Sequence, residues 1–351
     1  MTKRIAVIPG DGIGPEVARA GVRVLETLAK KRNLALAFDW FDYGAERYLR
    51  DGTTLPDADI ENLRSYDAIF FGAVGDPRVP GGEHARDILL GLRFKLDLYV
   101  NFRPCKLYDD SLSPLKGKGQ KELDFVIFRE NTEGLYTGAG GVFKKGTLDE
   151  IAIEEDINTR KGVERIIRAA FAYASERGLK RVCMADKANA MQHSGGLWRR
   201  TFSLVKAQYP QIESSVMYID ALAMDLVRRP ERYQVIVTGN LFGDIITDLG
   251  AALTGGLGLA ASANLHPGRL GLFEPVHGSA PDIVGKEQAN PLAMCLTGAL
   301  MLRHLHYPAE ATLLEECVAR CVREGLRTPD LGGTKRTGEV EARLIQLLEI
   351  A

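Results

Sequence analysis

The stretch Ile5–Val17, with the sequence IAVIPGDGIGPEV, separates two possible α/β folds. An apolar run followed by a glycine-rich turn is typical of the dinucleotide-binding fingerprint G-x-G-x-x-G, whose third glycine packs a helix against the strand. Gly10 and Gly12 match the first two glycines, but Pro15 occupies the third position. Proline is well tolerated in the first turn of a helix. The stretch therefore predicts a strand and a helix that begins near Pro15, without a pyrophosphate-binding glycine loop.

Apolar runs alternate with helical patterns along most of the chain. The runs lie at 5–8, 68–74, 125–128, 181–185 and 235–239. The clearest helical pattern spans 159–178, with Thr159 as a possible N-cap and Gly178 as a possible C-cap. Strands that alternate with helices predict βαβ units and a largely parallel sheet. The segment 243–291 begins as a helical pattern and continues as a long stretch rich in glycine and proline, which is typical of a functional segment.

Length and composition exclude several function classes. A chain of 351 residues predicts two domains or one large α/β unit. The 45 Lys and Arg residues against 46 Asp and Glu give a formal charge of -1, which excludes a global electrostatic attraction to nucleic acid or to an anionic membrane. The five cysteines are scattered without CxxC spacing, so we expect reduced and mostly buried thiols. Since the sequence contains neither a signal-peptide pattern nor an apolar run of about 18 residues, we expect a cytoplasmic protein.

Polar side chains follow three of the predicted strands. Arg129 and the segment ENTEGLY follow the run at 125–128, Asp186 and Lys187 follow the run at 181–185, and Asn240 follows the run at 235–239. In open parallel sheets, ligands bind outside the carboxyl ends of the strands. We therefore expect these side chains to contribute to one site.

Two carboxylates in the next segment suggest a metal site. Asp244 and Asp248 are four residues apart in a helical pattern, so both lie on one helix face. Carboxylate oxygens suit a hard divalent cation such as Mg²⁺ or Mn²⁺. Asp near a helix N-terminus is also favoured by the helix dipole, and the spacing alone leaves both interpretations open. Asp220 is a candidate third ligand.

Arginines, a lysine and a tyrosine complete the set of candidate functional residues. Arg93, Arg103 and Arg129 are suited to bidentate capture of carboxylates, although each one alone is also consistent with a surface ion pair. Lys187 and Tyr136 carry groups that can act in general acid–base catalysis. A metal-dependent hydrolase would also use paired aspartates, but it needs neither the three arginines nor the lysine and tyrosine.

Taken together, the motifs of this chain resemble those of the β-decarboxylating dehydrogenases, the isocitrate/isopropylmalate dehydrogenase family. The resemblance spans residues 4–350 and rests on IPGDGIGPEV, LRFKLDLYVNFRP, RENTEGLY, DKANA, YIDALAMDLV, GNLFGDIITDLG, LFEPVHGSAPDIVGKEQANP and TPDLGG. It implies a two-domain α/β fold distinct from the Rossmann fold. It also implies a large cofactor-binding domain made of 1–98 and 255–351, and a small domain, 99–254, with the substrate and metal residues and the interface of a homodimer.

The resemblance implies a role for each candidate residue. Arg93, Arg103 and Arg129 would bind the substrate carboxylates, and Asn189 would also contact the substrate. Asp244 and Asp248 would bind Mg²⁺ or Mn²⁺ in one subunit, with Lys187 and Asp220 contributed by the other. Lys187 would remove the hydroxyl proton through Asp220 or water, and Tyr136 would protonate the enol formed after decarboxylation.

The resemblance also implies the cofactor site. Its residues would be Ile13, Val74, Glu274, His277, Gly278, Ser279, Ala280, Asp282, Ile283 and Asn290. The glycines before Pro15 would let the backbone approach the nicotinamide half of the cofactor, with Ile13 in contact with it. Asp282 and Ile283 would face the adenosine ribose, where an acidic side chain accepts hydrogen bonds from a free 2′-hydroxyl and repels a 2′-phosphate. NADP-dependent relatives carry Lys-Tyr at this pair. The resemblance therefore predicts NAD.

The apolar pair Leu89 and Leu90 bears on the substrate. In the family, residues before the position of Arg93 face the C3 substituent, and two leucines suit an isopropyl group. This favours 3-isopropylmalate and a place in leucine biosynthesis. Arg86, where isopropylmalate enzymes usually have Glu, and the segment RENTEG, where they have RELTGG, are departures from that pattern. The segment that follows, 138–174, is similar to the D-malate/tartrate branch, so D-malate, tartrate, isocitrate and homoisocitrate stay open as alternatives.

Overall fold

The computed structural model describes residues 2–351, and the chain folds into two units. Unit 1 comprises Met1–Leu98, Pro104–Leu123 and Ala251–Ala351, and unit 2 comprises Tyr99–Arg103 and Asp124–Gly250. Residues 104–123, which we expected in the small domain, therefore lie in unit 1. An ion pair of 3.2 Å between Arg327 and Asp109 helps to hold this segment there. The functional assignment of the two units stays a prediction.

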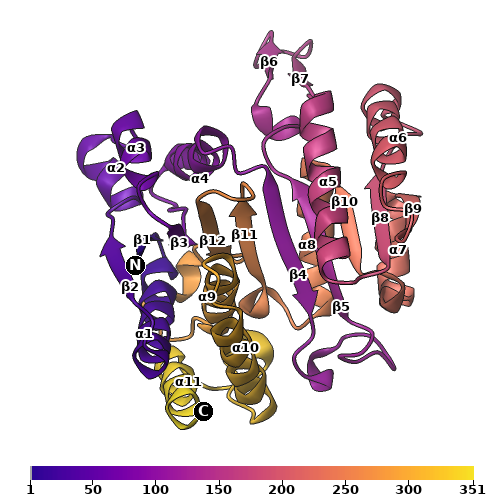
Figure 1. Ribbon diagram of the computed structural model, residues 1–351. Coiled ribbons are helices and arrows are strands. Elements are labelled where there is room, and N and C mark those ends of the chain that lie inside the picture. The colour runs from indigo at the N-terminus through magenta and orange to yellow at the C-terminus, as the bar shows by residue number, and fades with distance from the viewer. Residues whose placement is uncertain (1) are drawn as a thin grey trace. The chain divides into compact units, whose positions relative to one another are not determined.

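Unit 1 is built on a five-stranded, mostly parallel arrangement (Figure 1). The strand order is β2-β1-β3-β12-β11, in which β11 and β12 are antiparallel and the other pairs are parallel. Its strands and helices are β1 Lys3–Gly10, α1 Gly14–Arg32, β2 Leu36–Trp40, α2 Ala45–Asp51, α3 Asp57–Leu63, β3 Ala68–Ala73, α4 Glu83–Lys95, β11 Ala261–Leu265, β12 Gly271–Pro275, α9 Leu292–His304, α10 Pro308–Arg323 and α11 Thr337–Ile350. The segment rich in glycine and proline thus contains two strands that the sequence analysis did not identify.

The turn between β1 and α1 has the predicted form. Helix α1 carries Pro15 in its first turn, as expected. Gly12 has φ +59°, and a Cβ at this position would lie 2.0 Å from the carbonyl oxygen of Ser279. Only glycine permits this backbone conformation and this close approach. Gly12 therefore lets the turn pack against neighbouring backbone. Helix α1 begins at Gly14, which confirms the predicted helix start near Pro15.

Unit 2 contains a second, parallel set of strands. The strand order is β4-β5-β10-β8-β9, and β5, β10, β8 and β9 pair in parallel. Its elements are β4 Val100–Lys106, which continues into unit 1, β5 Asp124–Glu130, β6 Gly140–Phe143, β7 Ile151–Glu154, α5 Arg160–Glu176, β8 Arg181–Asp186, α6 Gln192–Lys206, β9 Glu213–Tyr218, α7 Ile219–Arg228, β10 Val235–Thr238 and α8 Asn240–Leu253. The predicted α/β class and the largely parallel pairing are confirmed.

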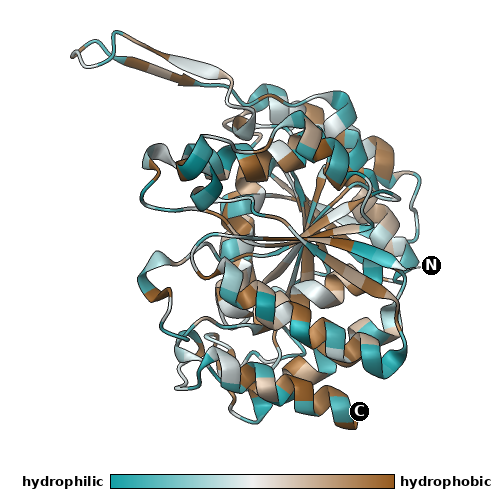
Figure 2. Cartoon of the chain, turned by 90° about the vertical axis from the view of Figure 1, so that its left-hand side faces the viewer, coloured by the Kyte–Doolittle hydropathy of each residue, from teal (hydrophilic) through white to brown (hydrophobic). Residues whose placement is uncertain are grey.

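Helix α5 illustrates how the apolar pattern determines packing. Thr159 caps its N-terminus, since its side chain accepts a hydrogen bond from Gly162 N, and Gly178 follows its C-terminus with φ +66°. Val163, Ile166 and the other apolar residues at helical spacing are fully buried. Burying one such side chain stabilises the fold by about 1.5–3 kcal/mol. In Figure 2 much of the central strands is coloured as hydrophobic, whereas teal is frequent on the outer faces of the helices.

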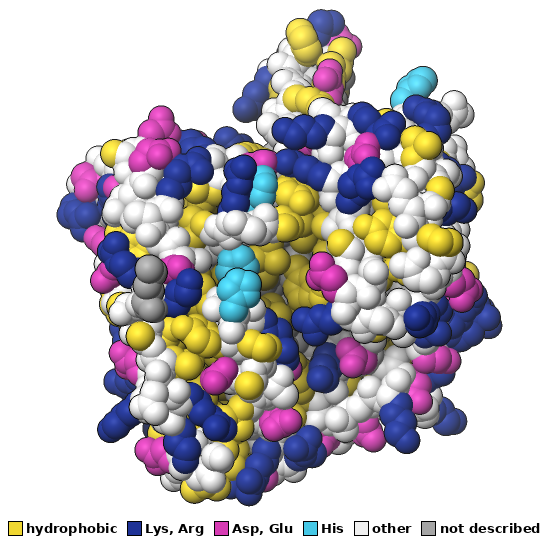
Figure 3. All heavy atoms as spheres, in the orientation of Figure 1, with side chains coloured by type: hydrophobic (Ala, Val, Ile, Leu, Met, Phe, Trp, Pro, Cys, Tyr) yellow, Lys and Arg dark blue, Asp and Glu magenta, His cyan; other side chains and the backbone are white. Residues whose placement is uncertain are grey.

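A two-stranded arm extends from unit 2. Strands β6 and β7 pair antiparallel, and the arm projects at the top of Figures 1 and 2. Phe143 is 61% exposed and Ile151 is 53% exposed. Figure 3 shows hydrophobic side chains gathered on this arm. Large apolar side chains exposed together are typical of an interaction surface.

The cysteines and helices agree with two further expectations. All five cysteines are buried. Burial raises the pKa of Cys183 to about 11 and that of Cys321 to about 12, so these thiols are protonated at neutral pH.

Among residues 2–351, no helix is long and apolar enough to cross a membrane.

Candidate active site

Arg129 is the buried centre of the polar cluster in unit 2. It lies at the end of β5, and only 1% of its surface is exposed. Its Nε donates to Asn240 Oδ1 at 3.0 Å, and its Nη1 donates to Asp244 Oδ1. Tyr136 donates its hydroxyl proton to the other oxygen of Asp244, Oδ2, at 2.7 Å. Two segments far apart in the sequence, 129–136 and 240–244, thus converge on one carboxylate.

The environment of Tyr136 keeps its hydroxyl protonated. Partial burial and the hydrogen bond to Asp244 raise the pKa of Tyr136, while the guanidinium of Arg129 opposes the shift. The Arg129 guanidinium carbon lies 5.0 Å from the centre of the Tyr136 ring, which adds a cation–π contact. A protonated phenol held in a fixed direction can donate a proton.

Helix α8 carries both predicted metal-ligand candidates. Asp244 and Asp248 lie one turn apart, and their side chains are 40% and 63% exposed. A Cβ at position 243 would lie 2.4 Å from Arg129 Cγ. Gly243 therefore leaves room for the Arg129 side chain to pack against helix α8. Arg103 donates to Thr247 Oγ1 at 2.7 Å and lies 3.5 Å from Asp248. The helix therefore brings two carboxylates beside two buried arginines.

A tight turn after β5 positions the loop that leads to Tyr136. Glu130 is 2% exposed and accepts hydrogen bonds from Thr132 N at 3.0 Å and Glu133 N at 2.8 Å. Burial raises the pKa of Glu130, while these hydrogen bonds act in the opposite direction. Asn240 also donates to the Glu133 backbone oxygen at 2.8 Å. The turn is therefore fixed from two sides.

Lys187 forms the second cluster in unit 2, at the end of β8. Its Nζ lies 2.7 Å from Asp220 Oδ2, and the lysine side chain is 28% exposed. The Lys187 ammonium lowers the pKa of Asp220. The preceding Asp186 is buried and accepts hydrogen bonds from Arg199 Nε at 2.7 Å and Nη2 at 3.0 Å. Asn189, two residues further on, is exposed.

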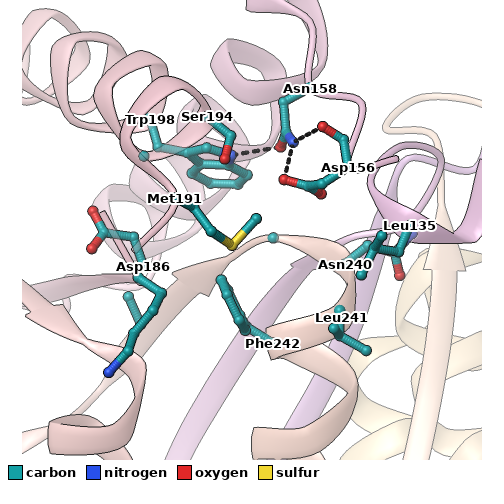
Figure 4. Close-up of a pocket in the computed structure, with 14 residues that line it drawn as sticks. Leu135, Asp156, Asn158, Asp186, Met191, Ser194, Trp198, Asn240, Leu241 and Phe242 are labelled. Atoms are coloured by element: carbon teal, nitrogen blue, oxygen red, sulfur yellow. Dashed lines mark hydrogen bonds between the residues drawn. The ribbon is translucent and has the colours of Figure 1, made fainter. Parts of the chain in front are cut away.

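A cavity of about 50 Å³ lies beside this cluster. Trp198 donates its indole N–H to Asn158 Oδ1 at 2.9 Å, and Asn158 Nδ2 donates to Asp156 at 2.7 Å. Figure 4 shows these three side chains on one side of the cavity and Met191 and Phe242 near its centre.

Helix α4 holds the predicted substrate residues of unit 1. Leu89 and Leu90 are half-buried, and Leu89 packs against a core cluster that includes Ile88 and Leu92. Arg93 is 6% exposed and donates to Glu274 Oε1 at 2.8 Å. The helix therefore carries an apolar pair and a fixed cation.

Several of the predicted cofactor residues of unit 1 lie in the segment 277–290. His277 Nε2 is buried and has no hydrogen-bond partner within residues 2–351, while burial lowers the pKa of this imidazole. A buried nitrogen without a partner is consistent with a site that a ligand completes. Asn290 Nδ2 donates to Asp330 at 3.0 Å, which fixes this amide. Asp282 and Ile283 lie in a short 3₁₀ turn with Asp282 exposed, so its carboxylate is accessible to a ribose hydroxyl.

The remaining predicted cofactor residues lie in or against the 277–290 segment or at the core of unit 1. Ile13 N donates to the Ser279 backbone oxygen at 2.9 Å, and Val74 packs against the same core cluster as Leu89. Gly278 is exposed, and Ala280 has a left-handed φ of +41°. The binding of a dinucleotide by these residues stays a prediction.

The carboxylate side chains of the two aspartates on helix α8 are chemically suited to bind a divalent cation. Asp244 and Asp248 offer carboxylate oxygens, the ligands that Mg²⁺ and Mn²⁺ prefer. Within residues 2–351, no group of three or more His, Cys, Asp or Glu side chains could hold a metal ion. Asp220 instead pairs with Lys187. Its predicted role as a third ligand from another subunit stays a prediction.

Three further residues help to build the site; sequence reasoning expected Asn240 there but did not single out Thr247 or Arg199. Asn240 holds Arg129 and the loop before Tyr136, Thr247 holds Arg103, and Arg199 holds Asp186. Asn240 follows a strand and Thr247 lies between the two aspartates, so their positions in the sequence indicate that they can lie at the site. Arg199 lies inside a helix, 13 residues from Asp186, and only the packed structure reveals it.

The family model and the relatives found by comparison all belong to the isocitrate/isopropylmalate dehydrogenases. The family model described as isocitrate/isopropylmalate dehydrogenase matches residues 4–344. The 3-isopropylmalate dehydrogenase of Thermobifida fusca (strain YX) is 47% identical over 340 residues, which are 96% of each chain. That of Corynebacterium jeikeium (strain K411) is 48% identical over 349 residues, covering 99% of this chain and 100% of the relative.

Solved structures with the same fold also match over nearly the whole chain. The crystal structure of isocitrate dehydrogenase from Methylococcus capsulatus superposes with a TM-score of 0.89 at 38% identity, covering 99% of both chains. The TT0538 protein from Thermus thermophilus gives a TM-score of 0.89 at 37% identity, covering 99% of this chain and 68% of that chain.

Proposed function

The chain belongs to the isocitrate/isopropylmalate dehydrogenase family, and on this premise we propose that it oxidises and decarboxylates 3-isopropylmalate to 4-methyl-2-oxopentanoate, with NAD and Mg²⁺ or Mn²⁺. It is a β-decarboxylating dehydrogenase, and family membership removes the hydrolase alternative. The proposed product is a precursor of leucine. The observation that carries the proposal is the convergence of Arg129, Tyr136 and Asp244 at the end of β5.

The proposed reaction assigns a step to each cluster. Arg93, Arg103 and Arg129 bind and orient the two carboxylates of the substrate, since guanidinium groups match carboxylates in geometry and charge. Lys187 removes the C2 hydroxyl proton, through Asp220 or water, as the hydride leaves C2. When bound, NAD⁺ supplies the hydride acceptor and the divalent ion supplies Lewis acidity.

The second half of the proposed reaction uses Tyr136. Loss of CO₂ from the 3-carboxy-2-oxoacid leaves an enol that needs a proton at C3. The raised pKa of Tyr136 keeps its phenol protonated at neutral pH. The hydrogen bond to Asp244 fixes the direction of the hydroxyl. Tyr136 is therefore suited to donate this proton.

The choice of substrate rests on helix α4 and on the relatives. Leu89 and Leu90 present apolar surface one turn before Arg93, which suits an isopropyl group. The curated relatives named above act, by their names, on 3-isopropylmalate, whereas the solved neighbour at 38% identity is an isocitrate dehydrogenase. Both observations favour 3-isopropylmalate over the more polar acids.

We expect the purified protein to form NADH fastest from 3-isopropylmalate. The measurement is the absorbance of NADH with NAD⁺, Mg²⁺ and, in separate assays, 3-isopropylmalate, D-malate, tartrate, isocitrate or homoisocitrate. One misplaced methylene or hydroxyl in an apolar pocket costs about 10–200-fold in kcat/KM. A higher kcat/KM with D-malate or tartrate would replace the proposed substrate, and no NADH from any of the acids would reject the dehydrogenase chemistry itself.

The cofactor preference has a separate test. Replacing Asp282 by Lys and Ile283 by Tyr removes the carboxylate that favours a free 2′-hydroxyl and adds a cation for a 2′-phosphate. We expect the ratio of kcat/KM for NAD⁺ to that for NADP⁺ to fall by about 10²-fold or more, since charged hydrogen bonds contribute about 1.5–3 kcal/mol each. Lys286→Ala, a change of an exposed cation nearby, serves as the control. An unchanged ratio in the double variant would contradict the ribose assignment.

We also propose that the protein is a homodimer with shared active sites. Met224 on α7 is 59% exposed and Ile245 on α8 is 61% exposed, in addition to the apolar side chains of the β6–β7 arm. Apolar surface of this kind supports a self-complementary interface. In such a dimer, Lys187 and Asp220 of one protomer complete the site that contains Asp244 and Asp248 of its partner.

A further inference from the structure

Asp11, in the turn between β1 and α1, is a buried carboxylate with three hydrogen-bonding partners. It is 6% exposed. Its Oδ1 accepts from Ala45 N at 2.6 Å, and its Oδ2 accepts from Gly75 N at 2.8 Å. His84 Nε2 lies 2.9 Å from the same Oδ2. Since a carboxylate needs several donors when it is buried, each of these partners stabilises its charged form.

His84 connects this carboxylate to helix α4. It lies in the first turn of the helix and is fully buried. Its Nδ1 is buried without a partner among the described residues, so the tautomer that satisfies the site carries its proton on Nε2 and donates to Asp11. Tyr48 stacks on the imidazole at 5.9 Å between ring centres. The imidazole is therefore fixed in one orientation.

The partners of Asp11 place two predicted cofactor segments. Gly75 directly follows Val74, and Ile13 lies two residues after Asp11. Asp11 N donates to the Ala73 oxygen at 2.7 Å, and Ile13 N donates to the Ser279 oxygen at 2.9 Å. The side chain of Asp11 thus joins the turn after β1 to the turn after β3.

We infer that Asp11 and His84 are positioning residues for cofactor binding, and that they hold the 10–14 and 74–76 turns in the geometry that accepts the nicotinamide half of NAD. This inference rests on the proposed function, because the two turns are predicted cofactor segments. The side-chain partners of Asp11 are Ala45, Gly75 and His84, whereas the residues predicted to hold the adenosine half lie at 277–290. The pair therefore contacts the 10–14 and 74–76 turns directly, and it reaches the 277–290 segment only through the Ile13–Ser279 backbone hydrogen bond.

The inference has a consequence that a purely structural role lacks. Removing the His84 donor leaves one hydrogen-bonding position of the buried Asp11 carboxylate unpaired. The loss of this hydrogen bond costs free energy and loosens the 10–14 and 74–76 turns. Asn290, on the adenosine side, keeps its own hydrogen bond to Asp330. NAD should then bind more weakly, whereas ADP-ribose, which lacks the nicotinamide, should bind as before. General destabilisation of unit 1 would weaken both ligands together.

The test compares NAD and ADP-ribose binding by titration calorimetry on wild-type protein and three variants. His84→Leu removes the donor, and His84→Gln keeps an N–H that can reach Asp11. Tyr233→Phe is the matched control, because it removes one donor, at 2.7 Å, from the buried carboxylate of Asp225 in unit 2. A far-UV spectrum and a melting curve on each variant report folding.

We expect His84→Leu to raise the Kd for NAD by about tenfold or more and to change the Kd for ADP-ribose by less than about twofold, since losing one hydrogen bond to a charged group weakens binding by a factor of that order. His84→Gln should recover most of the affinity, and Tyr233→Phe should leave both ligands unaffected. Equal losses for both ligands, or none with His84→Leu, would overturn the inference. If wild-type protein binds neither ligand, the proposed function falls with it; if wild-type protein binds NAD, the inference is judged separately.

Discussion

Turnover by the Lys187→Ala protein is expected to fall by about 10²–10⁴-fold, the contribution of a general base to an enzymatic rate. Lys187 is the titratable group at the end of β8, and its Nζ lies 2.7 Å from Asp220, through which it would reach the hydroxyl proton. Lys187→Arg should be similarly impaired, because a guanidinium does not lose its proton in proteins. The measurement is kcat with 3-isopropylmalate, NAD⁺ and Mg²⁺.

The control for this prediction is Lys206→Ala, which removes an exposed lysine from the last turn of α6. It should have wild-type kcat. Comparable thermal stability of all three proteins would show that the fold is retained. If Lys187→Arg were as active as wild type, Lys187 would act only as a positive charge, and its assignment as the base would be wrong.

Activity is expected to disappear when EDTA removes divalent ions, and to return with Mg²⁺ or Mn²⁺ in wild-type protein but not in Asp244→Asn. Asp244 supplies two carboxylate oxygens at the centre of the cluster that also contains Arg129 and Tyr136. An amide is a poorer ligand for a hard cation than a carboxylate. We expect kcat/KM of Asp244→Asn to be lower by about 10²-fold or more, because a metal ion supplies several kcal/mol of transition-state stabilisation.

A binding measurement without turnover accompanies this prediction. A ligand that binds only the native state raises the melting temperature. Mn²⁺ should therefore stabilise wild-type protein, and Asp42→Asn, a change of an exposed carboxylate, equally well. Asp244→Asn should lose this effect. A full Mn²⁺-dependent shift in Asp244→Asn would show that the ion binds elsewhere.

The Lys187→Ala and Asp244→Asn proteins together test the shared active site. If Lys187 and Asp244 act in one site but come from different protomers, a mixed dimer of the two variants contains one intact site and one with both changes. Unfolding and refolding an equal mixture should therefore restore about a quarter of wild-type activity, since half of the dimers are mixed. If both residues of a site come from one chain, every site carries a change and no activity returns.

Much of the fold was predictable because local signals agree with one another. Pro15 marked the start of α1, and Thr159 capped α5 as its position predicted. Buried parallel strands read as short apolar runs, and five of them were located in this way. Strands β11 and β12 were missed, because glycine and proline surround them and interrupt the pattern. Their pairing depends on partners distant in the sequence, which no local signal reports.

The candidate site was predictable to a similar extent, for a related reason. Arg129 follows a predicted strand and Asp244 lies one turn into a helix, and the structure brings these two together, whereas Lys187 lies in a second cluster with Asp220. What the sequence could not show is how each group is held. Glu274 beside Arg93 and His84 beside Asp11 are 181 and 73 residues apart in sequence, respectively. Such pairs form only after the chain has packed.

Helix α4 also bears on how the substrate range of such an enzyme can change. Leu89 and Leu90 are only half-buried, whereas Arg93, on the following turn, is buried and tied to Glu274 at 2.8 Å. Substitutions at the two leucines can alter which substituent is accepted while the buried ion pair keeps its place. One helix thus carries replaceable apolar side chains beside a fixed ion pair, so the leucines can be substituted without disturbing Arg93, which we propose binds a substrate carboxylate.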